Sequence, residues 1–153
     1  MRLKRKFYNP RSNQYSKSSF SKNHYIQKLV KVYKYISRKT RSKFANAVFK
    51  RLSMSRKNIP CISLSSVIAK VPNNSEKIIV VIGKILNDER LLKIPKLTIC
   101  ALKISSSAYK RLNEAGVNII TMDQLLIMSP IGKNTILIRG KKSAKIVKKS
   151  STA

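Results

Sequence analysis

Acidic residues are scarce in this sequence: 5 aspartates and glutamates stand against 34 lysines and arginines, for a formal net charge of +29 over 153 residues. Mutual repulsion on this scale is tolerated when a strongly negative partner is usually bound, and nucleic acid is the first partner that it indicates. An anionic membrane surface is the second. Scattered carboxylates also disfavour a magnesium-dependent active site, because that chemistry needs carboxylates that converge on the metal.

Histidine and cysteine are equally scarce. His24 is the only histidine, and Cys61 and Cys100 are too far apart in sequence for the paired ligands of a zinc motif. A nucleophilic cysteine would have only that one imidazole as its base, and no acidic residue lies near it in sequence. We expect two buried, reduced thiols, with a disulfide as the alternative. The sequence therefore predicts no enzyme activity, no cofactor and no metal site.

Long apolar runs are missing as well. The longest notable one, IIVVI at residues 78–82, is far shorter than the roughly 18 residues that a membrane span needs. Residues 1–20 lack the apolar region of a secretory signal. Their Ser-rich, acid-free composition leaves an organellar presequence as an alternative, although Pro10 interrupts them and no apolar stripe is visible. We expect no membrane partner, and a basic amphipathic anchor is the second choice for the helices predicted below.

The cations are concentrated towards the two ends of the chain. Residues 1–75 contain 19 basic and no acidic residues, and residues 133–153 contain 7 basic and no acidic residues. Residues 76–132 carry 8 basic against 5 acidic residues, so an almost neutral centre lies between two basic arms. We predict a basic extended arm over 1–22, a basic helical segment over 23–75 that packs on the core, an α/β core domain over 76–140, and a basic C-terminal tail over 141–153.

Apolar residues at helical spacing predict two helices in the basic segment. The first carries its stripe from Ile26 to Ile36, and the second, capped by Thr40 or Ser42, carries its own from Phe44 to Leu52. A short third helix follows, with Ser63 as its cap. Tyr35 lies in the basic arc of the first helix, where its ring either stacks on nucleic acid or packs against a neighbouring segment.

The centre of the chain alternates β-branched apolar runs with helical segments. The predicted strands are residues 77–82, 97–104, 118–120 and 135–138. One helix begins at a cap among Ser105 to Ser107 and closes at Gly116, and another begins with a capping box of Thr121 and Gln124. Strands that alternate with helices predict an α/β fold.

A dense group of cations lies in KYISRKTRSKF, residues 34–44, which contains no acid. Lysines and arginines occupy positions 34, 38, 39, 41 and 43, across the end of one predicted helix, a turn and the start of the next. Such a turn can press against phosphates while both apolar stripes stay in the core, and folded RNA is recognised largely by shape and phosphate placement. The sequence therefore predicts that this stretch is a docking surface.

Four blocks of the chain resemble a known family. They are KRLSMSRKN at residues 50–58, the IPCISLSSVI that follows it, VVIGKILNDERLLKIPKLTICALKIS, and MDQLLIMSPIGKNTILIRG. From about Tyr25 to about Lys149 the sequence is similar, in the same order, to the eukaryotic-type large-subunit ribosomal protein eighteen family, which is related in fold to the universal large-subunit ribosomal protein fifteen. The resemblance implies a core of irregular β-β-α units, binding to large-subunit rRNA, neighbouring large-subunit ribosomal proteins as partners, and no catalytic role.

The candidate RNA-binding residues are the basic groups of the arms, of the helical segment and of the core, together with two polar neighbours. They are Arg2, Lys4, Arg5, Lys6, Arg11, Lys34, Tyr35, Arg38, Lys39, Arg41, Lys43, Lys50, Arg51, Ser55, Arg56, Lys57, Lys103, Arg111, Lys133, Arg139, Lys141 and Lys142. By the resemblance, those that match the family's basic blocks are Arg38, Lys39, Lys50, Arg51, Ser55, Arg56, Lys103, Arg111, Lys133 and Arg139.

Two functions remain open from the sequence. The first is a structural constituent of the cytosolic large ribosomal subunit that binds and stabilises folded rRNA, does not form homo-oligomers, and begins its assembly in the nucleus or nucleolus. The alternative is a free-standing nucleic-acid-binding or RNA-chaperone protein, which the composition alone allows equally well. An RNA-modifying enzyme is disfavoured because the residues for its chemistry are missing.

Overall fold

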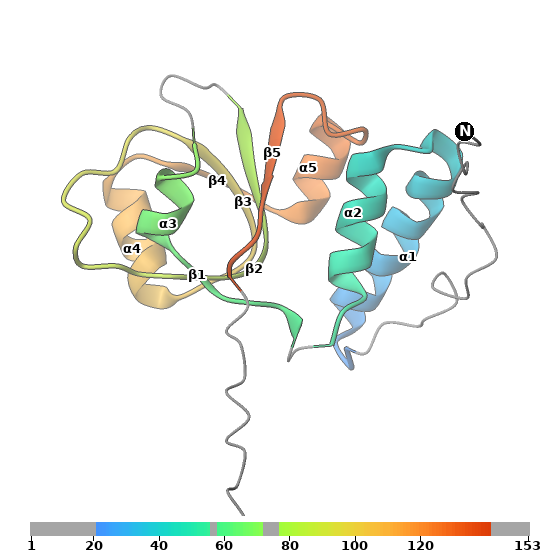
Figure 1. The fold of residues 1–153 in the computed structure, drawn as a ribbon, viewed down its shortest axis with the longest axis horizontal. Coiled ribbons are helices and arrows are strands. Elements are labelled where there is room, and N and C mark those ends of the chain that lie inside the picture. The colour runs from blue at the N-terminus through green and yellow to red at the C-terminus, as the bar shows by residue number, and fades with distance from the viewer. Residues whose placement is uncertain (1–20, 56–57, 72–76, 142–153) are drawn as a thin grey trace, which may run out of the picture.

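The structure is a computed structural model, and it describes residues 21–55, 58–71 and 77–141 (Figure 1). The elements in chain order are α1 (His24–Thr40), α2 (Lys43–Leu52), β1 (Ile62–Ser63), α3 (Leu64–Ile68), β2 (Ile78–Leu86), β3 (Thr98–Ile104), α4 (Ser106–Glu114), β4 (Asn118–Ile120), α5 (Met122–Met128) and β5 (Thr135–Ile138). This order confirms the predicted α/β class. The predicted basic arms lie almost entirely outside the described residues.

Within the described ranges, all strands belong to one parallel sheet built around the long strand β2. On one side β2 pairs with β3, which in turn pairs with β4. On its other side β2 pairs with β5 along its first half and with β1 at its end, where Ile85 lies opposite Ile62. Parallel sheets are found with both faces buried, so we expect other elements to cover each face of this sheet.

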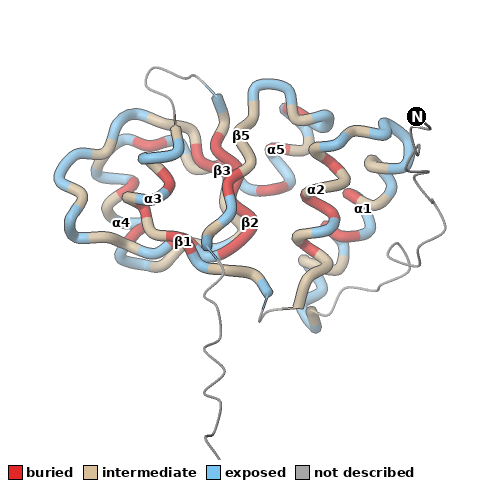
Figure 2. The backbone as a smooth tube through the Cα atoms, in the orientation of Figure 1, coloured by how far each residue is buried: buried red, intermediate tan, exposed pale blue. Residues whose placement is uncertain are grey.

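Each face of the sheet carries its own hydrophobic core. The first core joins α1, α2 and α5 to the sheet, where Val80 and Ile82 of β2 belong to it. The second core joins α3 and α4 to Ile79, Val81 and Ile85 on the opposite face. Figure 1 shows the sheet between these two groups of helices, and Figure 2 shows the buried residues that line it. The continuous apolar run of β2 is therefore buried on both sides, as predicted.

Side-chain caps fix where the helices begin. Ser42 and Ser63 accept hydrogen bonds from the backbone N–H groups three residues on, as the sequence predicts. At α5 the Thr121 hydroxyl accepts from the Gln124 N–H, and the Gln124 side chain accepts from the Thr121 N–H at 2.9 Å. Such a cap stabilises a helix by about 1 kcal/mol. The capping box predicted from the sequence is therefore confirmed.

The connection from β2 to β3 is a loop over residues 87–97, although parallel strands are usually joined through a helix. The Arg111 guanidinium of α4 donates a hydrogen bond of 2.6 Å to the backbone carbonyl of Asp88. Leu91, Ile94 and Leu97 of the loop pack against the second core. The loop is thus held by apolar contacts, by Arg111 and by the Ser65 hydroxyl, which donates a hydrogen bond to the Asp88 carboxylate.

The two cysteines differ from the prediction of two buried thiols. Both are free, and Cys100 is buried in the first core, but Cys61 is exposed. The prediction for Cys61 is wrong because it lies just before the two-residue strand β1, which the sequence analysis did not predict. Burial raises the pKa of the Cys100 thiol to about 12, with a smaller contribution from the charge of Asp123, so that thiol is unreactive.

Candidate nucleic-acid interface

The turn between α1 and α2 is anchored to the α/β core. The Ser42 hydroxyl, which caps α2, donates a hydrogen bond of 3.0 Å to the carbonyl of Ile131 in the loop before β5. In the same loop Gly132 has a φ of +84°, and a Cβ there would overlap the Phe44 ring. Only glycine fits this position, because both the backbone conformation and the ring contact exclude a side chain. These contacts hold the cations of the turn at a fixed position on the fold.

We name the cations of this turn the turn cluster: Lys34, Arg38, Lys39, Arg41 and Lys43. Lys34 is half-buried and the other four are exposed. Arg41 ends α1 in the left-handed conformation, with a φ of 51°. The structure therefore brings together the residues of the predicted docking surface across a helix end, a turn and a helix start.

Tyr35 lies beside this cluster with 62% of its surface exposed. The ammonium group of Lys39 lies 5.8 Å from the centroid of its ring, within the range of a cation–π contact. A ring this exposed is not packed within the chain. Aromatic rings that stack on bases lie beside basic groups, so the position of Tyr35 favours the stacking interpretation.

A second group of cations meets where α2, α3 and β5 end, and we name it the edge cluster: Arg51, Lys70 and Arg139. The Arg51 guanidinium donates a hydrogen bond of 3.2 Å to the carbonyl of Ile138, and the Lys70 ammonium group donates one of 3.0 Å to the carbonyl of Arg139. Burial lowers the pKa of Arg51, and the nearby charge of Arg139 lowers it further. Like charges are therefore held close together at this edge.

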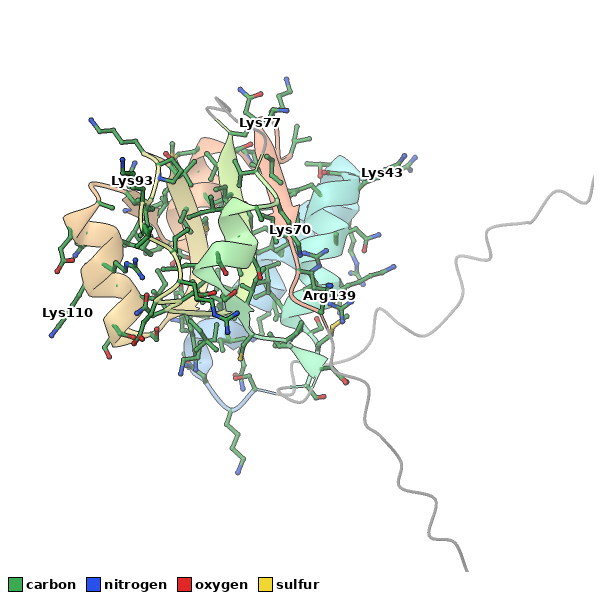
Figure 3. The ribbon with its side chains drawn as sticks, turned by 60° about the vertical axis from the view of Figure 1, so that its left-hand side comes forward. Lys43, Lys70, Lys77, Lys93, Lys110 and Arg139 are labelled. Carbon is green, nitrogen blue, oxygen red and sulfur yellow. The ribbon has the colours of Figure 1, made fainter. Side chains whose placement is uncertain are left out.

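Figure 3 shows Lys43 of the turn cluster and Arg139 of the edge cluster on one side of the molecule, with Lys93 and Lys110 on the other. The sequence analysis missed Lys70. Its backbone position, just after α3, gives no sign that its side chain reaches the end of β5. Lys50, Lys133 and Lys141 are exposed and belong to neither cluster.

Two candidates take part in local structure instead. Arg111 is half-buried, and its guanidinium lies 3.4 Å from the side-chain oxygen of Asn87 in addition to its bond to the Asp88 carbonyl. Ser55 accepts a hydrogen bond of 3.1 Å from the Asn58 side chain. The remaining candidates outside the described residues are Arg2, Lys4, Arg5, Lys6, Arg11, Arg56, Lys57 and Lys142.

Displaced pKa values occur at packed or capped positions. Burial raises the pKa of Tyr33, whose hydroxyl donates a 3.4 Å hydrogen bond to the Met122 carbonyl inside the first core. A hydrogen bond from the Ser65 hydroxyl lowers the pKa of Asp88. Packing and local hydrogen bonds explain these shifts. In the described part of the chain, no three histidine, cysteine or acidic side chains gather as metal ligands, and no helix is long and apolar enough to cross a bilayer.

Comparison with known proteins gives a consistent result. The family model described as ribosomal protein 60S L18 and 50S L18e matches residues 2–153. The large ribosomal subunit protein eL18 of Diaphorina citri is 42% identical over 127 residues, which cover 82% of this chain and 68% of that protein. The corresponding protein eL18A of Schizosaccharomyces pombe is 43% identical over 129 residues, with coverages of 82% and 69%. For eL18 of Drosophila melanogaster the identity is 43% over 123 residues, with coverages of 79% and 65%.

Proposed function

The chain belongs to the family of ribosomal proteins 60S L18 and 50S L18e, and from this premise we propose that its basic surfaces dock on folded rRNA of the large ribosomal subunit. It is a structural constituent of that subunit and not an enzyme. The observation that carries the docking proposal is the turn cluster, an exposed group of cations on an anchored turn, in a segment without acidic residues.

The geometry of the turn cluster suits phosphate rather than base recognition. Arg38 and Arg41 carry planar guanidinium groups that can bind a phosphate through two hydrogen bonds, whereas Lys39 and Lys43 supply a more diffuse charge. Contacts to phosphates fix the position and orientation of a protein on RNA without reading its sequence. Tyr35 adds a ring that can stack on an unpaired base next to those phosphates. The edge cluster extends the same basic side towards the end of β5 (Figure 3).

The end of α5 and the loop after it, which adjoins the turn cluster through the Ser42–Ile131 hydrogen bond, suit a protein neighbour. Ile127, Met128 and Ile131 at the end of α5 and in the loop after it are 83%, 62% and 49% exposed. Between residues 112 and 132 the chain has no lysine or arginine. Exposed apolar side chains without cations favour protein over RNA as a partner. We propose that a neighbouring large-subunit ribosomal protein covers this face.

The remaining parts of the proposal concern assembly. Strong net positive charge opposes contact between two copies of the chain, so we propose that it does not form homo-oligomers. We place the assembled protein in the cytoplasm and the start of its assembly in the nucleus or nucleolus. The division into an arm at 1–22, a helical segment at 23–75, a core at 76–140 and a tail at 141–153 also stays a proposal. The first core supports joint folding of the middle two parts, because it contains α1 and α2 as well as β2 and β3.

Sedimentation of a cell extract tests the function. The tagged protein should migrate with large subunits in a gradient and stay with them in moderate salt, because an integral constituent is held by many phosphate contacts at once. A protein found mostly in the light fractions, or released by moderate salt into them, would support the free-standing RNA-binding alternative instead.

A further inference from the structure

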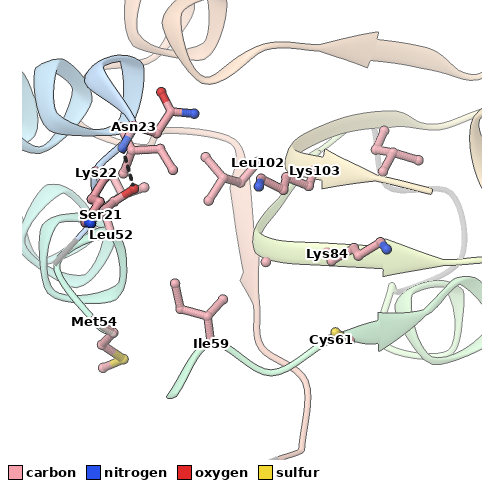
Figure 4. A pocket seen from close by; sticks show the side chains of 13 residues that line it. Ser21, Lys22, Asn23, Leu52, Met54, Ile59, Cys61, Lys84, Leu102 and Lys103 are labelled. Carbon is pink, nitrogen blue, oxygen red and sulfur yellow. Dashed lines mark hydrogen bonds between the residues drawn. The ribbon is translucent and has the colours of Figure 1, made fainter. Parts of the chain in front are cut away.

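A pocket of about 860 Å³ lies between the helical segment and the sheet (Figure 4). The start of α1 and the end of α2 form one wall, and the ends of β2 and β3 form the other. Its volume lies within the range of roughly 300–1,000 Å³ that is common for ligand sites. Neither cluster described above lines it, so we name it separately, as the lysine-rimmed pocket.

Three lysines reach the rim of this pocket: Lys22 before α1, Lys84 on β2 and Lys103 on β3. All three are exposed, and the described lining contains no carboxylate. The positive end of the α1 dipole also opens onto the pocket, since Ser21 and Asn23 beside its first turn belong to the lining. The electrostatic environment of the pocket therefore favours an anion.

An irregularity in the sheet pairs the backbones of two of these lysines. Val81 pairs with Ala101, but the next pair is Lys84 with Lys103, so β2 carries one residue more than β3 in between. Neighbouring strands lie about 4.8 Å apart, and like charges opposite each other on two strands are destabilising. Bulges of this kind are common beside functional sites, where they redirect a side chain. A bound anion between Lys84 and Lys103 would remove the repulsion.

The interior of the pocket is apolar. Ile26, Ile59 and Leu102 contribute to its lining from three different segments. Gly83 in the bulge lets the segment before β1 come close, because a Cβ there would lie 2.8 Å from the carbonyl oxygen of Pro60. The pocket thus combines aliphatic side chains inside with lysines at the rim. A nucleotide has the matching chemistry, a base with flat faces that pack on apolar side chains, joined to a charged phosphate.

We propose that the lysine-rimmed pocket binds an unpaired nucleotide of RNA, with its phosphate at Lys84 and Lys103 and its base against the apolar interior. The inference rests on the proposed docking on rRNA and adds a second kind of contact, single-stranded rather than shape-based. The chain's own first twenty residues are a poor occupant, because they contain basic residues and no acid. An acidic peptide shares the charge of RNA but lacks the flat base, so the interior favours RNA.

Cys61 makes the proposal testable, because it lines the pocket and is exposed whereas Cys100, the other cysteine, is buried. The probe is an oligouridylate of about ten nucleotides, within the ~4–16 nucleotides that single-strand sites cover. The rate at which a maleimide modifies Cys61 in the full chain is measured with and without it. At an RNA concentration of ten times Kd we expect the rate to fall about tenfold, since only the free pocket reacts.

Affinity across a salt series tests the lysines. Lys84→Gln combined with Lys103→Gln should reduce the salt slope of oligouridylate binding by about 0.7 to 1.4, which corresponds to one or two phosphates lost. The matched control, Lys93→Gln with Lys96→Gln, removes the same charge from exposed positions in the loop between β2 and β3 and should leave the slope unchanged. Ile59→Ala should weaken binding several-fold without a change in slope, because it removes apolar contact and no charge.

The inference is overturned if Cys61 keeps its rate in the presence of RNA, or if the pocket variant behaves like the control. It is also overturned if polyglutamate protects Cys61 at lower concentration than the oligouridylate does, since the occupant would then be a protein. Binding of the same preparations to total large-subunit rRNA separates the two claims. Wild-type binding with unprotected Cys61 refutes the pocket alone, whereas no binding to that rRNA refutes the docking proposal as well.

Discussion

Replacing three of the four exposed cations of the turn cluster separates charge from fold. In the variant Arg38→Gln, Lys39→Gln, Arg41→Gln every altered side chain is exposed. The change removes the cation–π contact of Lys39 with Tyr35, which is worth about 0.5–1 kcal/mol at an exposed site. Relief of repulsion among the cluster offsets part of this loss. We therefore expect the free energy of unfolding to change by less than about 1 kcal/mol, or a few degrees in Tm.

The effect on RNA binding should be far larger. Each phosphate contact contributes a salt slope of about 0.9, so the loss of three contacts lowers the slope by up to about 2.7. At an ionic strength of about 0.15 M this corresponds to roughly a hundredfold loss of affinity. The assay is filter binding of the folded protein to large-subunit rRNA fragments over a salt series, together with incorporation of the tagged variant into large subunits.

A matched triple variant controls for net charge. Lys93→Gln, Lys96→Gln and Lys110→Gln remove the same charge from exposed positions, and Figure 3 shows Lys93 and Lys110 on the side away from Lys43. This control should bind almost as well as the wild type. If both triple variants lose the same affinity, binding depends on total charge and the turn is not a docking surface. If the turn variant unfolds yet docks normally when rescued at low temperature, the stretch is structural.

Three further changes test the supports of the fold. Phe44→Ala should cost about 2 kcal/mol in chemical denaturation, because the half-buried ring packs on Gly132 and against the first core, and an unchanged midpoint would contradict that packing. Arg111→Lys keeps the charge but loses the guanidinium bond to the loop carbonyl, so we expect lower stability, whereas lower rRNA affinity at unchanged stability would support its assignment as RNA-binding. Asp88→Asn should reduce the loss of stability on acidification. The folded pKa of Asp88 is below its unfolded value of about 3.9. Its contribution to the free energy of unfolding is therefore present above about pH 4 and is lost as the pH falls through the folded pKa. Identical acid titrations of the two proteins would refute this.

The sequence predicts the elements well because their signals are local. The stripe from Ile26 to Ile36 has helical period, and the helix it predicts continues in the structure to Thr40, whose hydroxyl donates a hydrogen bond of 2.8 Å to the Ile36 carbonyl. Caps such as Ser63 depend on two or three neighbouring residues. Continuous runs of β-branched residues predict the buried strands. Each of these patterns can be recognised without knowing what the segment packs against.

The sites that the sequence misses depend on contacts between distant segments. Strand β1 has two residues, too few for any periodicity, and it forms because β2 extends past β5 and leaves its end unpaired. The register shift that aligns Lys84 with Lys103 arises between strands whose residues are 19 apart, so no spacing along the chain reveals it. Arg111 is a basic residue of the kind that contacts RNA, but in the structure its guanidinium supports the β2–β3 loop through the Asp88 carbonyl. Its role depends on where the β2–β3 loop runs.

The positions of the cations explain how a protein with so much positive charge can fold. The first core takes residues from the inner sides of α1 and α2, whereas the turn cluster occupies the positions at which those helices end and begin. Repulsion between exposed charges is weak, because water and salt screen them over about 8 Å at physiological ionic strength. The same charges lose water when they meet a phosphate, and their interaction then strengthens. An anchored turn adds to the binding free energy, because little conformational entropy is lost when it binds. The fold can therefore keep its cations apart from its core and still present them at fixed positions to RNA.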